Sequence, residues 1–329
     1  MAVNVAHLLD LPRLEDELSS LERRLTEAVS TEDPFLTQVA RHLVDAGGKR
    51  LRPALTLAAA GAGSADGPVA PDEVLLGGVS VELVHVGSLC HDDVIDEAAT
   101  RRGVETVNAK WGNLIAILAG DFLLARASEI AAGLGTEVAG LLAATIAKLC
   151  QGQTLEIQAA YDVNRSETSY LAAIAGKTAS LMSAACRIGA LTAGLDRDQL
   201  EALTSYGHAF GMVFQICDDV LDVVGTDQML GKPAGLDMVA GVYTLPVIRT
   251  LADEDSGAEL RPLLGGPLDP PERDKARAIV RSSGAIGGCL ELARDYADQA
   301  ASAVDGLAPT VGQALGRLGH LVIDDLPAV

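Results

Sequence analysis

Aromatic residues are scarce in this chain: only 3% of its 329 residues are Phe, Trp or Tyr, and there is one tryptophan. Aromatic side chains are the usual stacking platforms for nucleic-acid bases. Basic residues are also few, 25 against 45 acidic ones, which gives a net charge of −20. We therefore expect no binding to nucleic acid or to anionic lipid surfaces, since both require clustered positive charge.

Long uncharged runs and export signals are missing as well. The longest run without a formally charged side chain, Ala202 to Cys217, is shorter than the roughly 20 residues that span a bilayer. The N-terminus mixes charges with leucine and has no basic segment leading into an apolar one, so no signal peptide is indicated. The sequence predicts a cytoplasmic protein without an integral membrane segment.

Closely spaced cysteine pairs are absent too. The chain has five cysteines and no CxxC spacing, and each cysteine stands in apolar sequence. An odd number without paired spacing argues against disulfides and zinc sites. We predict buried free thiols at Cys90, Cys150, Cys186, Cys217 and Cys289.

What the chain has in abundance is aliphatic residues at helical spacing, as in Leu14, Leu18, Leu21 and Leu25. Such spacing is typical of amphipathic helices, and the alternation typical of strands is almost absent. Four segments with Gly, Pro or polar clusters are predicted to be loops: Thr31 to Pro34, Gly61 to Asp72, Asp162 to Glu167 and Asp253 to Arg273. No change of composition borders them, which predicts a single all-α domain over residues 1–329.

One acidic pattern occurs twice, as Asp92-Asp93-Val94-Ile95-Asp96 and as Asp218-Asp219-Val220-Leu221-Asp222. We call these segments the first and second pentads. Each follows an apolar helical run. On a helix the first and last aspartates of a pentad share a face, and the second is turned about 100° away. Carboxylates one turn apart suit Mg²⁺, which prefers oxygen ligands and often bridges to substrate phosphates.

A single pentad could equally be a solvated acidic turn at a helix end. Two copies, each with basic and glycine residues nearby, favour a metal site instead. The pair Asp324-Asp325 lacks such surroundings and is interpreted as surface charge.

Several segments of the chain add basic residues to these carboxylates. Lys49 and Arg52 lie in the segment Gly47 to Pro53, Arg101 and Arg102 follow the first pentad, Lys177 precedes Thr178 on a separate segment, and Lys232 follows the second pentad. In so acidic a chain, this grouping indicates clamps for a diphosphate substrate.

Together these segments, from about Gly47 to Pro246, resemble the trans-isoprenyl diphosphate synthases, also called polyprenyl synthetases. Gly47 to Pro53 is similar to the family's homoallylic-substrate loop, and the two pentads to its two aspartate-rich motifs. The resemblance implies a bundle of ten or more helices around a central cavity, usually in a homodimer. It also implies Mg²⁺-dependent, head-to-tail condensation of isopentenyl diphosphate onto an allylic diphosphate, with three metal ions when substrate is bound.

The resemblance also assigns roles position by position. Asp92, Asp96 and Asp218 match direct Mg²⁺ ligands, and Asp93, Asp219 and Asp222 match groups that complete the metal site through hydrogen bonds or water. Arg101, Lys177 and Lys232 match residues that hold the allylic diphosphate. Lys49, Arg52, His85 and Arg102 match those that hold isopentenyl diphosphate, although His85 by itself, like His91, reads as an ordinary helix-surface histidine. Thr178 and Gln215 match groups that face the developing allylic cation.

Two departures from the family pattern stand out. Val242 occupies the position of a common phosphate-facing lysine, which predicts weaker allylic binding, and the segment from Ile323 to Val329 is acidic and apolar where many relatives are basic. Rival interpretations are a class I terpene cyclase, which does not need the Gly47 to Pro53 loop, and a non-catalytic synthase subunit, which does not need intact pentads.

Product length is predicted from the residues just before the first pentad. Short-chain relatives commonly carry an aromatic residue four or five positions before the first aspartate, where this chain has Ser88 and Gly87. We therefore expect products longer than C20; the alternative is a geranylgeranyl or farnesyl diphosphate synthase. Val84 and Val81 lie farther along the same helix, and they either line a tunnel or belong to the ordinary core.

Overall fold

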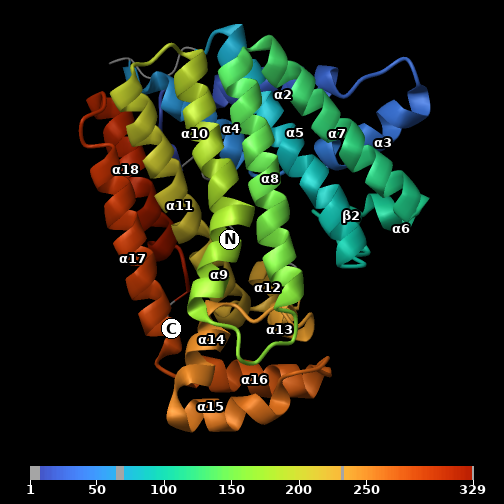
Figure 1. The fold of residues 1–329 in the computed structure, drawn as a ribbon, viewed down its shortest axis with the longest axis vertical. Coiled ribbons are helices and arrows are strands. Elements are labelled where there is room, and N and C mark those ends of the chain that lie inside the picture. The colour runs from blue at the N-terminus through green and yellow to red at the C-terminus, as the bar shows by residue number, and fades with distance from the viewer. Residues whose placement is uncertain (1–7, 64–69, 231–232, 328–329) are drawn as a thin grey trace.

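The computed structural model describes residues 8–63, 70–230 and 233–327 and is almost entirely helical (Figure 1). The all-α prediction is confirmed, with more than ten helices in the described residues. The strands in this part of the chain are β1 (Thr100–Arg101) and β2 (Val104–Glu105), which form a short antiparallel hairpin. The helices of the first half are α2 (Leu14–Ala28), α3 (Pro34–Asp45), α4 (Leu51–Ala60), η1 (Gly61–Gly63), α5 (Asp72–Ile95), α6 (Val107–Trp111), α7 (Asn113–Gly133) and α8 (Thr136–Gln158).

The second half completes the bundle and adds short helices at one end. Its helices are α9 (Glu167–Ile174), η2 (Ala175–Ala179), α10 (Ser180–Thr192), α11 (Arg197–Val224), α12 (Asp227–Leu230), α13 (Leu236–Val239), α14 (Leu245–Ala252), α15 (Glu254–Leu260), η3 (Arg261–Leu263), α16 (Pro270–Ser282), α17 (Ala285–Ala303) and α18 (Pro309–Asp324). In Figure 1, α14, α15 and α16 gather at the lower end, and α17 and α18 run along one side.

Helix α5 is a core helix that ends in the first pentad. Apolar side chains of α5 point to all sides of the helix, a pattern typical of a helix without a solvent face. Helices α4, α7 and α10 pack against it. Among the described helices it is the one long and apolar enough to cross a membrane, yet 72% of its apolar window is buried inside the bundle. Its burial in the bundle explains its apolar composition.

Helix α11 brings the second pentad to the same region. Its start is fixed by a capping box. The Asp196 side chain accepts a hydrogen bond from the Gln199 backbone N–H, and the Gln199 side chain accepts one from the Asp196 backbone N–H. Such a box satisfies two N–H groups that a helix start leaves unpaired. Helix α11 then packs against α10 and α17, which buries the apolar run before Asp218.

Two predictions were wrong in part. The segment Asp253 to Arg273 contains α15 and η3, because the Asp253 side chain caps α15 by accepting from the Ser256 N–H at 2.9 Å. All five cysteines are free thiols as predicted, but Cys150, on α8, is exposed and not buried.

Candidate active site

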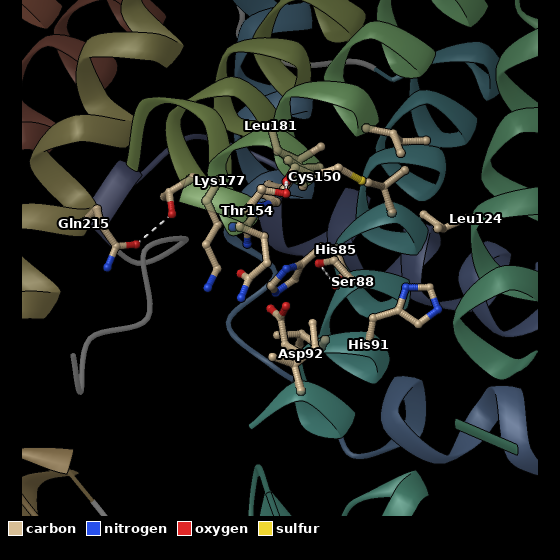
Figure 2. Close-up of a pocket in the computed structure, with 18 of the residues that line it drawn as sticks. His85, Ser88, His91, Asp92, Leu124, Cys150, Thr154, Lys177, Leu181 and Gln215 are labelled. Carbon is tan, nitrogen blue, oxygen red and sulfur yellow. Dashed lines mark hydrogen bonds between the residues drawn. The ribbon is translucent and has the colours of Figure 1, made fainter. Parts of the chain in front are cut away.

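A cavity of about 520 Å³ lies between the helices that carry the two pentads. Its described lining residues are Arg52 from α4; Val84, His85, Ser88, Leu89, His91, Asp92 and Ile95 from α5; Leu124 from α7; Ile146, Leu149, Cys150, Gln153, Thr154 and Ile157 from α8; Lys177 and Thr178 from η2; Leu181 from α10; and Gln215 and Asp218 from α11. Figure 2 shows Lys177 and Gln215 on one side and Leu124 on the other. The cavity thus combines charged groups with an aliphatic wall.

The first pentad divides its carboxylates between the cavity and the protein interior. Asp92 lines the cavity. Burial raises the pKa of its carboxyl, an effect that Lys177 opposes and the Asp96 carboxylate reinforces. Asp96 follows the last residue of α5 and is exposed. Asp93 is fully buried and accepts a 2.5 Å hydrogen bond from Arg101 Nε, so its contact is with Arg101, as its turn away from Asp92 predicts.

The second pentad is divided in the same way. Asp218 lines the cavity, whereas Asp219 is buried and accepts hydrogen bonds from Tyr170 Oη at 2.5 Å and from Gln215 Nε2 at 2.8 Å. Burial raises the pKa of Asp219 to about 7, although both of these hydrogen bonds lower it. Asp222 is buried and accepts from the backbone N–H of Asp237 at 3.4 Å, which ties α11 to the start of α13.

Lys177 reaches the cavity from a short π-helix, η2, between α9 and α10. Single π-turns often occur at functional sites. The turn passes so close to α8 that a Cβ on Gly152 would lie 2.5 Å from the Lys177 backbone nitrogen. The Lys177 ammonium pairs with the Glu156 carboxylate. Burial disfavours the Lys177 charge, but Glu156, Asp92 and Asp96 outweigh this effect and raise its pKa.

Arg52 and His85 also line the cavity. Arg52 Nε is buried and has no hydrogen-bond partner among the described residues. Burial lowers the pKa of Arg52 to about 10. The pKa of His85 lies well below its usual value, first because of burial and then because of the nearby charges of Arg52 and Arg102. His85 is therefore neutral at pH 7, beside arginines suited to bind an anion.

Three of the predicted phosphate-binding residues lie outside the cavity lining formed by the described residues: Lys49, Arg101 and Arg102. The side chain of Lys49 is exposed. Partial burial of its ammonium lowers the pKa of Lys49, and the nearby charge of Asp218 opposes this effect. Arg102 Nη1 donates to the carbonyl oxygens of Leu43, at 3.1 Å, and Gly47. Gly48 has a φ of +146°, a backbone conformation that favours glycine, and a Cβ there would lie 2.8 Å from the Arg102 guanidinium carbon. Lys232 lies outside the described residues.

Sequence reasoning missed several residues of the site. Gln153 and Thr154 line the cavity, and Glu156 binds Lys177. The spacing of Gln153 and Glu156, one turn apart on a helix, was a usable signal. His91 also lines the cavity, and its Nε2 lies 3.2 Å from the Ile117 carbonyl oxygen.

The donor chemistry of the cavity fits a hard divalent cation. Asp92 and Asp218 reach one cavity from different helices, and both offer the oxygen atoms that Mg²⁺ prefers. Within residues 8–63, 70–230 and 233–327, no three acidic, histidine or cysteine side chains are grouped closely enough to hold a metal by themselves. These protein groups therefore fit a metal ion that takes its remaining ligands from oxygen atoms of the substrate.

Comparison with known proteins places this site in a family. Residues 33–282 match the family model described as polyprenyl synthetase. The chain is 40% identical over 311 residues to heptaprenyl diphosphate synthase component 2 of Geobacillus stearothermophilus, covering 94% of this chain and 95% of that protein. It is 37% identical over 285 residues to a nonaprenyl diphosphate synthase of Mycobacterium tuberculosis, covering 86% and 84%.

Solved structures agree with these sequence matches. A polyprenyl synthase from Caulobacter crescentus CB15, complexed with calcium and isoprenyl diphosphate, superimposes with a TM-score of 0.90 at 33% identity and 98% coverage of both chains. Geranylgeranyl diphosphate synthases match as well. The chain belongs to the polyprenyl synthetase family. It is a prenyltransferase that makes polyprenyl diphosphates, which confirms the predicted activity over the cyclase and non-catalytic interpretations.

Proposed function

We propose that this enzyme condenses isopentenyl diphosphate onto an allylic diphosphate in the cavity described above, with Mg²⁺ as the metal, and releases products longer than C20. The observation that carries the proposal is the approach of Asp92 and Asp218 to one cavity that Lys177 and Arg52 also line. Opposed carboxylates and flanking cations suit two diphosphates and their metal ions, and an aliphatic wall suits the prenyl chain.

Lys177 binds the leaving group of the allylic substrate. When the allylic carbon–oxygen bond breaks, the electron pair stays on the diphosphate, whose negative charge increases. Lys177 has three N–H donors and uses one on Glu156, which leaves donors for phosphate oxygens. An ammonium held in place beforehand stabilises this charge more in the transition state than in the ground state.

Thr178 and Gln215 face the cation that ionisation leaves on the prenyl chain. Both line the cavity, and Thr178 Oγ1 lies 2.7 Å from Gln215 Oε1. Their oxygen dipoles stabilise positive charge without forming a covalent bond. The double bond of isopentenyl diphosphate then attacks the cation, and the proton that is lost goes to the departing diphosphate.

Arg52 and His85 hold isopentenyl diphosphate for that attack. The Arg52 guanidinium is always available as a donor, and its Nε has no partner among the described residues. His85, being neutral, donates from one ring nitrogen. Holding the second substrate in place converts a bimolecular encounter into a reaction within one complex.

Mg²⁺ would be held by Asp92, Asp96 and Asp218, with Asp93, Asp219 and Asp222 as supporting groups, and three ions are proposed with substrate bound. When bound, the metal neutralises diphosphate charge during ionisation. Asp93 supports the site through Arg101, and Asp219 does so through Gln215. The calcium in the Caulobacter crescentus structure supports a divalent cation in this fold.

The aliphatic wall supports a long product. Leu124, Ile146, Leu149 and Leu181 line the cavity together with Ser88, and Ser88 is too small to block a growing chain. Each buried CH₂ contributes about 0.8 kcal/mol, which favours retention of the chain for further rounds. The long-chain relatives support this length, and a geranylgeranyl diphosphate synthase is the alternative.

A second copy of the chain is the proposed partner. Leu114, Ile117 and Leu118 are 68%, 44% and 56% exposed on one face of α7, and three apolar residues at this spacing favour burial against another helix. The G. stearothermophilus relative is described as one component of its synthase, so a different subunit is the other candidate. Light scattering of the purified chain should give a dimer mass that Leu118→Asp lowers to a monomer mass. We retain a single domain and a cytoplasmic location as further proposals.

The direct test is an assay of the purified chain alone. Farnesyl diphosphate, labelled isopentenyl diphosphate and Mg²⁺ should give labelled products longer than C20 on reversed-phase thin-layer chromatography, and chelation should abolish them. Products that stop at C20 with excess isopentenyl diphosphate would contradict the length. If the chain alone is inactive and a second, different protein restores its activity, the proposed homodimer would be contradicted.

A further inference from the structure

Three hydrogen bonds connect Tyr170, on α9, to the cavity. Tyr170 Oη donates to Asp219 Oδ2 at 2.5 Å, Gln215 Nε2 donates to Asp219 Oδ1 at 2.8 Å, and Thr178 Oγ1 donates to Gln215 Oε1 at 2.7 Å. Figure 2 marks the last of these at Gln215. Thr178 and Gln215 line the cavity, whereas Tyr170 is not among its described lining residues.

The chemistry of these groups fixes the direction of the chain. Both oxygens of Asp219 accept, one from Tyr170 and one from the NH₂ group of Gln215, so Gln215 turns its carbonyl oxygen to Thr178. That carbonyl in turn takes the hydroxyl proton of Thr178. The lone pairs of the Thr178 oxygen are then directed away from Gln215, and the negative end of its dipole faces the cavity.

Burial makes this chain stiff. Tyr170, Asp219 and Thr178 are 1%, 4% and 6% exposed. A hydrogen bond is stronger in such surroundings than in water, and neighbouring bonds polarise one another. Loss of the first donor leaves a buried carboxylate oxygen without that partner, which allows Asp219 and then Gln215 to reorient.

Tyr170 is held from its other side by a buried cation. The Arg165 guanidinium carbon lies 5.6 Å from the centre of the Tyr170 ring, and its Nη1 donates to the Tyr243 carbonyl oxygen at 3.0 Å. Arg165 is 7% exposed. A cation over an aromatic face is attracted to it, so the ring position is set by Arg165 and the hydroxyl by Asp219.

We propose that Tyr170 is a positioning residue for the ionisation step. Through Asp219 and Gln215, it orients the Thr178 hydroxyl so that its oxygen faces the developing allylic cation. This inference rests on the proposed role of Thr178 and Gln215 in the reaction. Tyr170 itself touches neither substrate.

Tyr170→Phe is the test, because it keeps the ring over Arg165 and removes only the hydroxyl. We expect kcat to fall about 10-fold, corresponding to about 1.4 kcal/mol of transition-state stabilisation, with KM for both substrates within about twofold of wild type. Tyr206→Phe is the matched control. Tyr206 is fully buried on α11, and its hydroxyl has no hydrogen-bond partner in the described part of the chain, so its kcat should not change.

A double-mutant cycle separates positioning from general damage. Thr178→Val should lower kcat and Thr178→Ser should largely retain it, and Tyr170→Phe should cost nothing further in the Thr178→Val background because both changes break one chain. Multiplicative losses, or equal losses in the two tyrosine variants, would overturn the proposal. Full activity of Thr178→Val would instead overturn the proposed role of Thr178.

Folding is checked by the melting temperature. If Tyr170→Phe does not yield folded protein, Asp219→Asn tests the chain from its middle, because an amide cannot accept two hydrogen bonds in the same geometry. Its kcat should fall, and Thr178→Val should add no further loss. Additive losses in that pair would overturn the proposal as well.

Discussion

Arg50, which lies between Lys49 and Arg52 in the sequence, forms a buried ion pair with Glu82. Arg50 Nη1 lies 2.9 Å from Glu82 Oε1, and the two side chains are 7% and 2% exposed. Arg50 also donates to Glu22 and to the Val44 carbonyl oxygen. This arginine therefore faces the protein interior and fixes the backbone between two predicted substrate cations.

Breaking this pair should destabilise the protein. Glu82→Ala removes the buried partner of Arg50 and leaves only the exposed Glu22 carboxylate beside it. Removal of one member of a buried pair costs about 3–5 kcal/mol. Urea unfolding followed by circular dichroism measures the change. Arg24→Ala, which breaks an exposed pair with Asp72, is the control and should cost less than about 1 kcal/mol. Similar losses in both variants would contradict the role of Arg50.

Asp92→Ala and Asp218→Ala should each lower kcat at least ~100-fold, the scale of removing a group that stabilises transition-state charge. The helical circular dichroism signal should stay nearly unchanged, because these carboxylates face the cavity and not the apolar core. Asp295→Ala, at an exposed position of α17, should keep wild-type turnover. Wild-type turnover in either pentad variant would contradict the metal assignment.

The two substrate clamps should separate in steady-state kinetics. Arg52→Ala should raise KM for isopentenyl diphosphate about 10-fold or more, and Lys49→Ala should raise it less, because only Arg52 of the two lines the cavity. Lys177→Ala should instead raise KM for the allylic substrate. If each variant changes both constants equally, the two clamps have been assigned wrongly.

Neutral His85 should make the fold sensitive to acid. Its folded-state pKa lies well below 6.5, so below pH 6.5 the unfolded chain binds a proton that the folded protein does not bind. Stability therefore falls as pH falls, by up to about 1.4 kcal/mol per pH unit from this group. The drop in melting temperature between pH 7 and pH 5 should be smaller in His85→Gln than in wild type. An identical drop would show that His85 is not the group responsible.

Ser88 and Gly87 should respond differently to phenylalanine. Ser88 lines the cavity, and Ser88→Phe should shift products to C15 or C20. A Cβ on Gly87 would lie 3.1 Å from the Gly120 carbonyl oxygen and 3.3 Å from Leu123 Cβ, so Gly87→Phe should lower the melting temperature by overpacking. Product sizing and thermal unfolding of both variants test this contrast. Shortened products from a fully stable Gly87→Phe would contradict it.

The contrast corrects an expectation from sequence. Position relative to Asp92 suggested that Gly87 and Ser88 both face the growing chain. A helix turns about 100° per residue, so Gly87 and Ser88 point in different directions, and a Cβ on Gly87 would point toward α7. The absence of a side chain at Gly87 lets α5 pack closely against α7, whereas the small side chain of Ser88 leaves room in the cavity.

The sequence by itself determined the helices and the two pentads, because both depend on local spacing. Residues at helical spacing identify a buried face without knowledge of what covers it, and the position of Asp93 one step beyond Asp92 was enough to predict a supporting role. The resemblance supplied the chemistry for the same reason, since its motifs are short continuous segments.

Only the tertiary structure decided which neighbours complete the site. Glu156 beside Lys177, Glu82 beneath Arg50 and Tyr170 behind Asp219 are pairs far apart in the chain. Their contacts depend on how closely the helices pack, as where Gly152 lets α8 approach η2. Local spacing carries no record of that approach, because it is set by the volumes of side chains on two different helices.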